Sequence, residues 1–455
     1  MKGNLANHDS GLTTGNSALW NQVCSELEHF TLWLENYGEV SRDHQTFFAG
    51  KIGGRAKALY YQHKGIGTAA VAPLIFFEAF LPGMRRFFHR PTRFPIADAH
   101  YAMGFAFLYQ VTRQPMYLVR AIHFLEELKR SRSPGFQEYC WGYPFDWVTR
   151  GGVIKEQTPF ITSTPYVFEA FLQVVQLVEQ LDGESLSELS CSSPAGFRDG
   201  PNEGKEILRS IARHAAQDIK DSPTSATASS CSYSPFHGGS VINAAAYRAF
   251  LLTSASHVFA KEEYWKIAER NLNFVLENQN SDGSWFYAVD GVRDFVDHFH
   301  TCFVMKALAK IHRLTGHGAT LEALSRGVAY YVENLFDVDG LPKPFSKAPR
   351  LTVYRRELYD CAECINLCLL LRDHFKPLDA TLEQVTEGIL KDWVKRDGSF
   401  RSRRLHFSWD NVPMHRWAQS QMFRSLAFYL HEESRGRQLA SPVVSEPSTL
   451  TPQQL

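Results

Sequence analysis

Two kinds of helical segment alternate along this chain, and their alternation limits the folds that the chain can adopt. One kind has a charged face opposite an apolar face, and these segments lie at about 116–131, 204–219, 262–279, 320–336 and 380–395. The other kind is apolar nearly all round, and these segments lie at about 96–112, 159–179, 239–257, 297–314, 357–374 and 412–432. A helix that is apolar all round must be buried, whereas a helix with a charged face can cover it from outside. The sequence therefore predicts an all-α protein of paired inner and outer helices.

The apolar segments repeat with a spacing near 60 residues. Intervals of 64, 79, 57, 60 and 58 residues separate the aligned positions Leu108, Leu172, Leu251, Leu308, Cys368 and Leu426. A repeat of this length holds one helical hairpin. With GTAAVAPLIFFEAFL (67–81) as the first outer helix, six hairpins result. An open array would leave one apolar face in water, so we expect the hairpins to close into a ring with six inner and six outer helices.

The predicted ring forms one domain, residues 66–433, of this 455-residue chain. Hydrophobic residues make up 44% of the chain, which is enough for so large a core. Residues 1–65 are expected to form an N-terminal helical extension, and residues 434–455 a disordered tail. Ser- and Gly-rich segments near 182–203 and 220–238 account for the longest interval and are predicted to be surface loops.

Composition argues against several classes of protein. Lysine plus arginine and aspartate plus glutamate both number 48, so no general nucleic-acid or anionic-membrane surface is expected. The polar start lacks the apolar core of a signal peptide and the most apolar stretch is too short and interrupted to span a membrane, so neither feature is expected, and eight cysteines in so long a chain do not suggest a disulfide framework. We therefore expect a cytoplasmic protein. Cys361, Cys364 and Cys368 follow one helix face without a second ligand pair nearby, which predicts core cysteines; neither a metal nor a cofactor is expected.

The connections from outer to inner helices are expected to open together on one face of the ring. They are long, as in RSPGFQEYCWGYPFDWVTRGGVIKEQTP and SDGSWFYAVDGVRDFVD, whereas return connections such as LTGHGA are short. Long loops on one face of a closed scaffold are where functional residues gather. The sequence thus predicts a site at that face, with the largest pocket in its centre.

One position in each inner helix is expected to line this pocket. Eight residues before the aligned positions stand His100, Thr164, Asn243, His300, Asp360 and Ala418. Five of these six are polar, whereas the residues one turn deeper are nearly all apolar, which predicts a funnel with a polar rim and a closed apolar floor. Helix capping is the alternative for the Thr, Asn and Asp residues. Histidine is a poor cap, so both histidines are expected to reach the pocket.

Aromatic and basic residues in the same loops suggest the ligand. Sugar rings stack their C–H faces on aromatic side chains and bond their hydroxyls to polar groups, while grouped cations favour an anionic ligand such as a uronate or phosphate. The alternatives are that the aromatic residues pack beneath the loops and that the cations are a solvated face. The predicted substrate-binding residues are Trp141, Tyr143, Trp147, Arg150, Thr164, Asn243, Trp285 and Trp409.

The stretch SDGSWFYAVDGVRDFVDHFH (281–300) contains the main catalytic candidates. Asp-Gly pairs at 282–283 and 290–291 predict turns, and the two aromatic residues at 285 and 287 are expected to face one way. A carboxylate three residues before a histidine on one helix face would orient that histidine as a base. The alternative is an aspartate cap beside a structural histidine. The predicted catalytic residues are His300, Asp297, Tyr287, His100, Asp360 and Asp146.

Several motifs add a resemblance to known families. Six hairpins with turns such as ENQNSDGSW resemble the (α/α)6 toroids, which include glycoside hydrolases, polysaccharide lyases, uronyl C5-epimerase domains, sugar 2-epimerases and the terpenoid cyclase/prenyltransferase group. WGYPFDW followed by TPFITSTPYVFEAFL, and DGSWFY followed by DHFHTCFVMKAL, resemble a bacterial family associated with surface-polysaccharide synthesis, over residues 95–430. The D-x-D-D motif of the cyclases, the zinc ligands of the prenyltransferases and the paired signature of the sugar 2-epimerases have no counterpart.

The resemblance implies a carbohydrate-active protein, an enzyme that acts on an anionic saccharide in bacterial polysaccharide metabolism. Two chemistries remain open: proton abstraction by a His or Tyr base, as in uronate lyases and epimerases, and glycoside hydrolysis by two of Asp146, Asp297 and Asp360. The expected partners are a saccharide or lipid-linked saccharide and polysaccharide-assembly proteins. The alternatives are an isoprenoid or lipid-linked substrate enzyme and a non-catalytic saccharide-binding assembly protein.

Overall fold

The computed structural model describes residues 14–181 and 200–440, and within these ranges six helices form a closed inner ring. Each inner helix contacts the next, and the last contacts the first. The inner helices are α5 (Pro95–Thr112), α7 (Thr164–Glu179), α10 (Ile242–Phe259), α12 (His298–Thr315), α14 (Leu358–Leu371) and α16 (Ser420–Ala440). They are buried over nearly their whole circumference, as their apolar sequences predict.

A second helix covers each inner helix from outside. The outer helices are α1 (Thr14–Tyr37), α6 (Pro115–Arg130), α9 (Gly200–Arg213), α11 (Glu262–Glu277), α13 (Gly318–Asn334) and α15 (Pro377–Asp392). This double ring of six hairpins is the predicted (α/α)6 toroid. Over the described residues no helix has the length and apolar character that a membrane span requires, and no cluster of three or more potential metal-ligating side chains is present.

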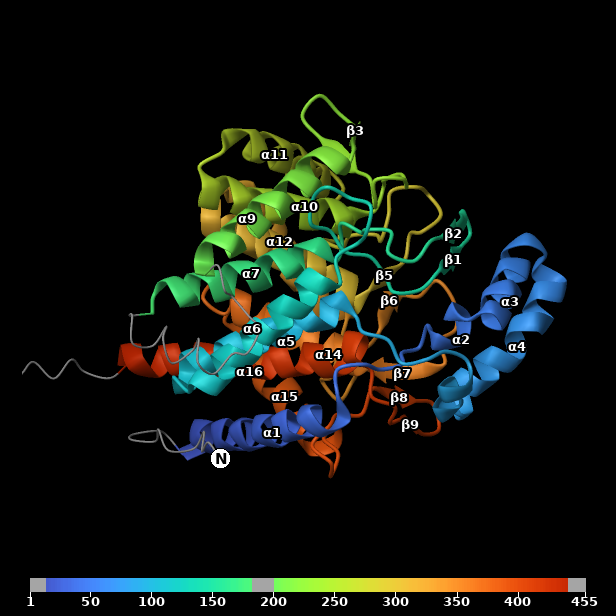
Figure 1. The fold of residues 1–455 in the computed structure, drawn as a ribbon, viewed down its shortest axis with the longest axis horizontal. Coiled ribbons are helices and arrows are strands. Elements are labelled where there is room, and N and C mark those ends of the chain that lie inside the picture. Colours follow the sequence, from blue (N-terminus) through green and yellow to red (C-terminus); the bar gives the residue numbers. More distant parts are fainter. Residues whose placement is uncertain (1–13, 182–199, 441–455) are drawn as a thin grey trace, which may run out of the picture.

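The prediction that residues 67–81 form the first outer helix is wrong. The sixth outer position belongs to α1, which buries Val23, Leu27 and Phe30 against the ring and contacts both α16 and α15. The segment 67–81 lies instead in α4 (Lys64–Phe80), which packs against α3 (Lys51–Gln62) as a helical pair beside the ring (Figure 1). Its apolar composition suggested burial, but much of its apolar surface is exposed.

Both predicted domain boundaries fall inside described helices. The predicted boundary at residue 65 falls in the first turn of α4, which packs on α3. Residues 434–440 of the predicted tail are the last turns of α16, and residues 441–455 lie outside the described residues. Most of the loop predicted at 182–203 also lies outside them, and the loop at 220–238 contains a short hairpin of two strands, β3 (Asp221–Pro223) and β4 (Ser229–Cys231).

The other short strands also lie in outer-to-inner connections and join neighbouring loops into a rim. All described pairs are antiparallel. The elements that complete the chain are α2 (Thr46–Ala49), η2 (Pro82–Phe87), β1 (Trp147–Thr149) paired with β2 (Gly152–Ile154), η3 (His214–Asp218), β5 (Val296–Asp297) paired with β6 (Phe345–Lys347), the sheet of β7 (Tyr354–Glu357), β8 (Arg403–Leu405) and β9 (Trp409–Asp410), and η4 (His415–Gln419), a turn of π-helix like η3.

A buried ion cluster fastens the α3–α4 pair to this rim. Arg85 of η2 pairs with Glu78 of α4 at 2.8 Å and with Asp410 of β9 at 2.7 Å. Arg403 of β8 pairs with the same Glu78 and with Glu357. Burial raises the pKa of Glu78, while the neighbouring guanidinium groups lower it. Because removal of one buried partner leaves another charge uncompensated, this cluster holds α4 in a defined position beside the rim.

Candidate active site

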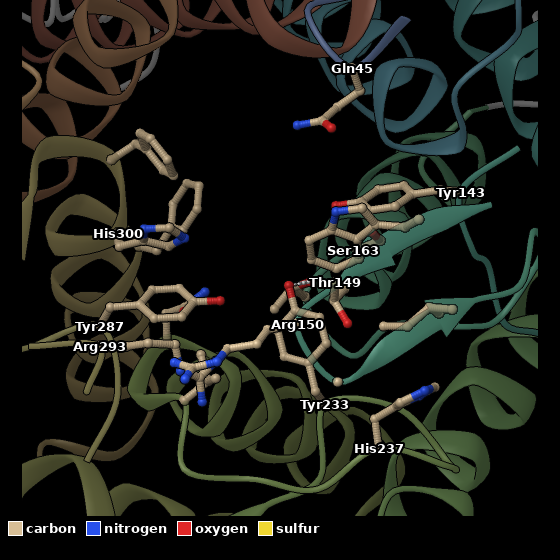
Figure 2. A pocket seen from close by; sticks show the side chains of 18 of the residues that line it. Gln45, Tyr143, Thr149, Arg150, Ser163, Tyr233, His237, Tyr287, Arg293 and His300 are labelled. Atoms are coloured by element: carbon tan, nitrogen blue, oxygen red, sulfur yellow. Dashed lines mark hydrogen bonds between the residues drawn. The ribbon is translucent and has the colours of Figure 1, made fainter. Parts of the chain in front are cut away.

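A cavity of about 800 Å³ opens on the face where the long connections meet (Figure 2). Twelve of its thirty lining residues are aromatic, whereas aromatic residues make up 13% of the chain. Aromatic side chains provide rigid, flat contact area. The lining aromatic residues are Tyr61, Tyr143, Phe145, Trp147, Tyr166, Tyr233, Tyr287, Phe295, Phe299, Phe303, Tyr359 and Trp417.

Three of the five predicted loops supply the lining of this cavity. Residues 143–163, 233–241 and 287–295 contribute side chains, whereas the connections 335–357 and 393–413 contribute none and instead build most of the strands of the rim. The missing part of the wall comes from two places that the sequence did not single out. His44, Gln45 and Tyr61 come from the segment between α1 and α5, and Arg416 and Trp417 come from the π-helical turn η4.

His300 projects into the cavity from the first turn of α12 and is held by Asp297 (Figure 2). Asp297 is the N-cap of α12: its Oδ1 accepts from the His300 backbone N–H at 2.9 Å, and its Oδ2 lies 2.6 Å from His300 Nδ1. A carboxylate accepts hydrogen bonds, so Nδ1 is the donor in this contact, and in the neutral form of the ring the lone pair lies on Nε2. Asp297 is buried and His300 is 23% exposed, so the aspartate both caps the helix and orients the histidine.

Tyr287 stands beside this pair on the same side of the cavity (Figure 2). Its ring lies 4.6 Å from the His300 ring, edge to face, and stacks on Phe295 at 4.8 Å. Burial raises the pKa of Tyr287 to about 12, so at neutral pH its phenol keeps its proton. It shares a hydrogen bond with Tyr233, whose hydroxyl also accepts from Thr162 Oγ1 at 3.3 Å. The cavity therefore holds a histidine with an open nitrogen next to a protonated phenol.

The charges in the cavity are mostly positive. Of the residues that the structure describes, three arginines line the cavity but only one carboxylate does, that of Asp290, which Arg293 binds at 2.6 Å. Although burial opposes the effect, hydrogen bonds from Arg293 lower the pKa of Asp290 to about 2. Arg416 pairs with Asp43 at 2.6 Å and lies over the Tyr143 ring. Arg150, at the turn between β1 and β2, has no acidic partner within the described residues.

His100, the second predicted histidine, does not reach the cavity. It is fully buried, and burial, together with the Arg424 guanidinium, lowers its pKa well below the usual value. Gly104 lies one turn further along α5 on the same face, and a Cβ there would come within 2.6 Å of the Phe423 ring. That face of α5 therefore packs closely on α16. His100 faces Arg424 instead of the cavity, with 3.4 Å between its Nδ1 and the Arg424 Nη1.

The predicted carboxylates Asp360 and Asp146 also lie outside the lining. Asp360 is fully buried, and burial, together with the charges of Glu357 and Asp297, raises its pKa well above the usual value. Asp146 is partly exposed and bonds Lys155 Nζ at 3.0 Å and the Glu156 backbone N–H at 2.9 Å. Of the predicted catalytic set, the structure thus brings together His300, Asp297 and Tyr287.

Half of the predicted substrate-binding residues line the cavity, namely Tyr143, Trp147, Arg150 and Asn243. Trp141 and Trp285 are buried, and their indole N–H groups donate to carbonyls in the last turn of the preceding outer helix, Leu128 O at 2.8 Å and Val275 O at 3.0 Å. These carbonyls have no partner within their helices, so each tryptophan closes a helix end. Trp285 consequently does not face the same way as Tyr287.

Thr164 and Trp409 are also absent from the lining. Thr164 is buried and donates to Phe160 O at 2.9 Å, and Trp409 packs against Trp393 and the guanidinium groups of Arg401 and Arg404. In three hairpins the residue one position earlier in the register lines the cavity instead of the predicted residue: Ser163, Tyr359 and Trp417. A shift of one residue turns a side chain by about 100° around the helix axis. The packing of each inner helix therefore decides which of the two neighbouring residues faces the cavity.

The sequence predicts an apolar floor for the cavity, and the residues found there are aromatic. The layer beneath this floor, however, is not apolar. Tyr166 and Phe303 line the floor. Behind them, Lys306 of α12 forms a buried ion pair with Glu363 of α14, and Lys310 pairs with Glu169 of α7. The ring therefore has a polar layer open to the cavity and a second beneath it, in which the Lys306–Glu363 pair is sealed from solvent.

The fold has relatives among solved structures. An unsaturated glucuronyl hydrolase from Bacillus sp. GL1, described as responsible for glycosaminoglycan degradation, is 12% identical with a TM-score of 0.56, over 92% of this chain and 97% of that chain. A cellobiose 2-epimerase from Bacillus thermoamylovorans is 9% identical with a TM-score of 0.53, over 76% and 88%. A GH76 α-mannanase from Bacteroides thetaiotaomicron is 9% identical with a TM-score of 0.52, over 78% and 90%.

These similarities show that the chain has the (α/α)6 toroid fold, in agreement with the helix contacts. No protein-family profile and no curated protein sequence matches the chain.

Proposed function

We propose that this protein is a carbohydrate-active enzyme that removes a proton next to the carboxylate of a uronate, as a lyase or epimerase does. The observation that supports this most directly is the His300–Asp297 pair, in which the 2.6 Å contact at Nδ1 leaves Nε2 free in the cavity. A histidine oriented in this way is suited to accept a proton. Arg150, a lining cation without an acidic partner within the described residues, is suited to bind the carboxylate.

The lining favours a saccharide as the ligand. The twelve aromatic residues offer stacking surfaces for sugar rings. Asn243 Oδ1 and Trp417 Nε1, both on lining residues, have no hydrogen-bond partner within the described part of the chain. Buried polar atoms are normally satisfied, so water or sugar hydroxyls are the expected partners. Solved structures with this fold include proteins named for unsaturated glucuronyl, mannan and cellobiose substrates, which is consistent with a saccharide.

The proposed reaction begins with transfer of the C5 proton of the uronate to His300 Nε2. Arg150 neutralises the carboxylate, which makes the C5 proton more acidic and stabilises the charge that develops on the carboxylate oxygens. In a lyase, the electron pair of the C5–H bond forms a C4–C5 double bond while the C4–O bond breaks, and the Tyr287 phenol donates a proton to the leaving oxygen. In an epimerase, the C4–O bond remains intact and a proton returns to the opposite face of C5.

Hydrolysis by two carboxylates has less support in this cavity. That chemistry requires two carboxyl groups on either side of the scissile bond. Among the described residues, the only lining carboxylate is that of Asp290, which Arg293 neutralises, and Asp297 is held behind His300. Asp360 is sealed, and Asp146 pairs with Lys155 outside the lining.

The test is incubation of the protein with matched uronate-containing and neutral polysaccharides. A lyase produces an unsaturated uronate, detected by ultraviolet absorbance, and an epimerase in D₂O incorporates deuterium at C5, detected by NMR. We expect one of these signals with a uronate polymer and at least about a tenfold loss in Asp297→Asn, which retains a capping oxygen but lacks the charge. Release of reducing ends without either signal would contradict the proposal in favour of hydrolysis, and binding without turnover would indicate a saccharide-binding protein.

The substrate we favour is a saccharide attached to a lipid. Large apolar side chains are exposed on α3, which also carries the lining residue Tyr61, and on α4 and η2; they include Ile52, Ile66 and Phe87. A free polysaccharide does not require such a surface. Comparison of turnover on a lipid-linked uronate oligosaccharide and on the same oligosaccharide after lipid removal tests this choice, and equal kcat/KM for both would contradict it.

A further inference from the structure

An exposed apolar stripe runs along α4 on the side away from its partner helix α3. Its residues are spaced by three and four positions, which places them on one face of the helix, and all of them are exposed. The stripe consists of Ile66, Ala69, Pro73, Phe76 and Phe80. Monomeric soluble proteins seldom expose a continuous apolar surface of this kind unless it binds something.

Large apolar residues are concentrated in this part of the molecule. Of the twenty-one large hydrophobic residues that are exposed within the described ranges, eight lie between residues 52 and 87. Ile52 is 77% exposed, Ile66 69% and Phe87 65%. The turn between β8 and β9 extends this surface, because Phe407 is exposed and its ring stacks on Phe80 at 6.0 Å.

Positive charge surrounds the same surface. Residues 51–90 contain seven lysines and arginines and one acidic residue, Glu78, which is buried in the ion cluster with Arg85. The exposed cations are Lys51, Arg55, Lys64, Arg86 and Arg90. The zero net charge of the whole chain therefore conceals a strongly basic segment, and no exposed acidic residue lies within it.

From these features we infer that the α3–α4 pair with η2, residues 51–87, is a docking surface for an anionic lipid bilayer. Exposed Phe and Ile side chains enter the interface between headgroups and acyl chains, while lysines and arginines bind the anionic headgroups. No described helix is long and apolar enough to cross a membrane, so the pair lies on the bilayer. From the balanced composition we predicted no anionic-membrane surface. A net charge, however, does not show how the charges are distributed along the chain.

A second copy of the chain fits this surface less well. A two-fold contact would place the same patch against itself, which brings the cations of both copies together without exposed acidic residues to offset them. An anionic bilayer supplies the complementary charge and the apolar layer at once.

The docking surface adjoins the mouth of the cavity. Tyr61 of α3 lines the cavity, and α3 packs on β1, the strand that precedes Arg150 (Figure 1). A bilayer bound to α3 and α4 would thus lie next to the opening, where the saccharide of a lipid would be presented. Membrane binding itself does not depend on the proposed reaction and can be tested without a substrate.

The test is flotation of the full-length protein with vesicles of phosphatidylcholine alone and of phosphatidylcholine with phosphatidylglycerol. We expect binding to the anionic vesicles that weakens at high salt, because screening reduces the headgroup contacts. The variant Ile52→Ser/Ile66→Ser/Phe87→Ser should lose at least about tenfold in binding, and Lys51→Glu/Arg55→Glu/Lys64→Glu a similar amount. Matched controls, Leu32→Ser/Val332→Ser on α1 and α13 and Lys266→Glu on α11, should bind like the wild type.

Three results would overturn the inference. The first is no binding of the wild-type protein to anionic vesicles at low salt. The second is equal loss of binding in the control variants. The third is a dimer in solution, measured by light scattering, that the apolar triple variant dissociates. Thermal midpoints near that of the wild type would show that the variants fold. The charge variant tests the same docking surface through three exposed cations, whose replacement should not disturb the core.

Discussion

His300 and His100 hold the same register position in two inner helices, but one faces the cavity and the other is sealed in the core. His300 lies at the N-terminus of α12, where Asp297 turns its Nε2 toward the cavity. His100 lies on the face of α5 that Gly104 allows to pack against α16, so it is buried beside Arg424. The same contrast separates the open layer around Arg150 from the sealed layer around Lys306 and Glu363. Residue type and depth along a helix were therefore not enough to predict which residues line the cavity, because the rotation of each helix decided exposure.

The largest expected difference is in turnover. His300→Gln should reduce kcat/KM on a uronate substrate by roughly 10²–10⁴-fold, because the proposed base is lost, with little change in the thermal midpoint. His100→Gln should leave kcat/KM within about threefold of the wild type, since the side chain does not reach the cavity. Steady-state kinetics on both proteins checks this. Similar losses in both variants would show that the sealed histidine belongs to the site.

The next effect concerns the free energy of unfolding. Lys306→Met should destabilise the protein by about 3–5 kcal/mol, because Glu363 would remain as an uncompensated buried charge. Urea unfolding measures this loss. The double variant Lys306→Met/Glu363→Leu should recover most of it, whereas Arg150→Ala in the open layer should stay within about 0.5 kcal/mol of the wild type. A large loss in Arg150→Ala would remove the distinction between the layers.

A smaller effect is expected on substrate affinity. Arg150→Ala should raise KM for an anionic saccharide by about tenfold or more, because a charged hydrogen bond contributes roughly 1.5–3 kcal/mol. KM for a neutral analogue should not change, and Arg435→Ala, at the far end of α16, should match the wild type for both. Kinetics on the matched pair of substrates checks this. An equal rise for the neutral analogue would exclude a carboxylate contact.

The smallest effect is expected on the free energy of unfolding for each unit change in pH. Burial lowers the pKa of His298 to about 3 and that of His415 to about 4. In the unfolded chain both titrate near pH 6.5, so the unfolded state binds more protons below that pH and the free energy of unfolding falls as pH decreases toward 4. The slope should be about 1.4 kcal/mol per pH unit for each histidine. His298→Gln should flatten the curve measured by thermal unfolding, and an unchanged slope would contradict the assignment.

Much of the local chemistry was predictable because it depends on residues close in sequence. Asp282 accepts from the Ser284 N–H at 2.9 Å before Gly283 turns the chain with a φ of 90°, and Asp290 likewise accepts from Val292 and Arg293 around Gly291. The contact between Asp297 and His300 spans three residues of one helix turn. Their catalytic role remains a prediction.

Contacts between distant segments account for what was missed. His44 and Gln45 line the cavity because the segment between α1 and α5 reaches its mouth, and Trp417 does so because η4 shifts the register at the start of α16. Trp141 and Trp285 were assigned to the ligand, but each closes a helix end. No local pattern separates a tryptophan that binds sugar from one that satisfies a carbonyl.

The sequence by itself determined the toroid, because buried and amphipathic helices of repeated length have few other ways to remove their apolar faces from water. It also determined the turns and the Asp297–His300 pair, since these need only neighbouring residues. Only the tertiary structure decided which polar residues of the inner ring are open, which helix takes the sixth outer position, and that the apolar segment 67–81 lies at the surface. The physical reason is that burial depends on what packs against a face, and composition records only how apolar that face is.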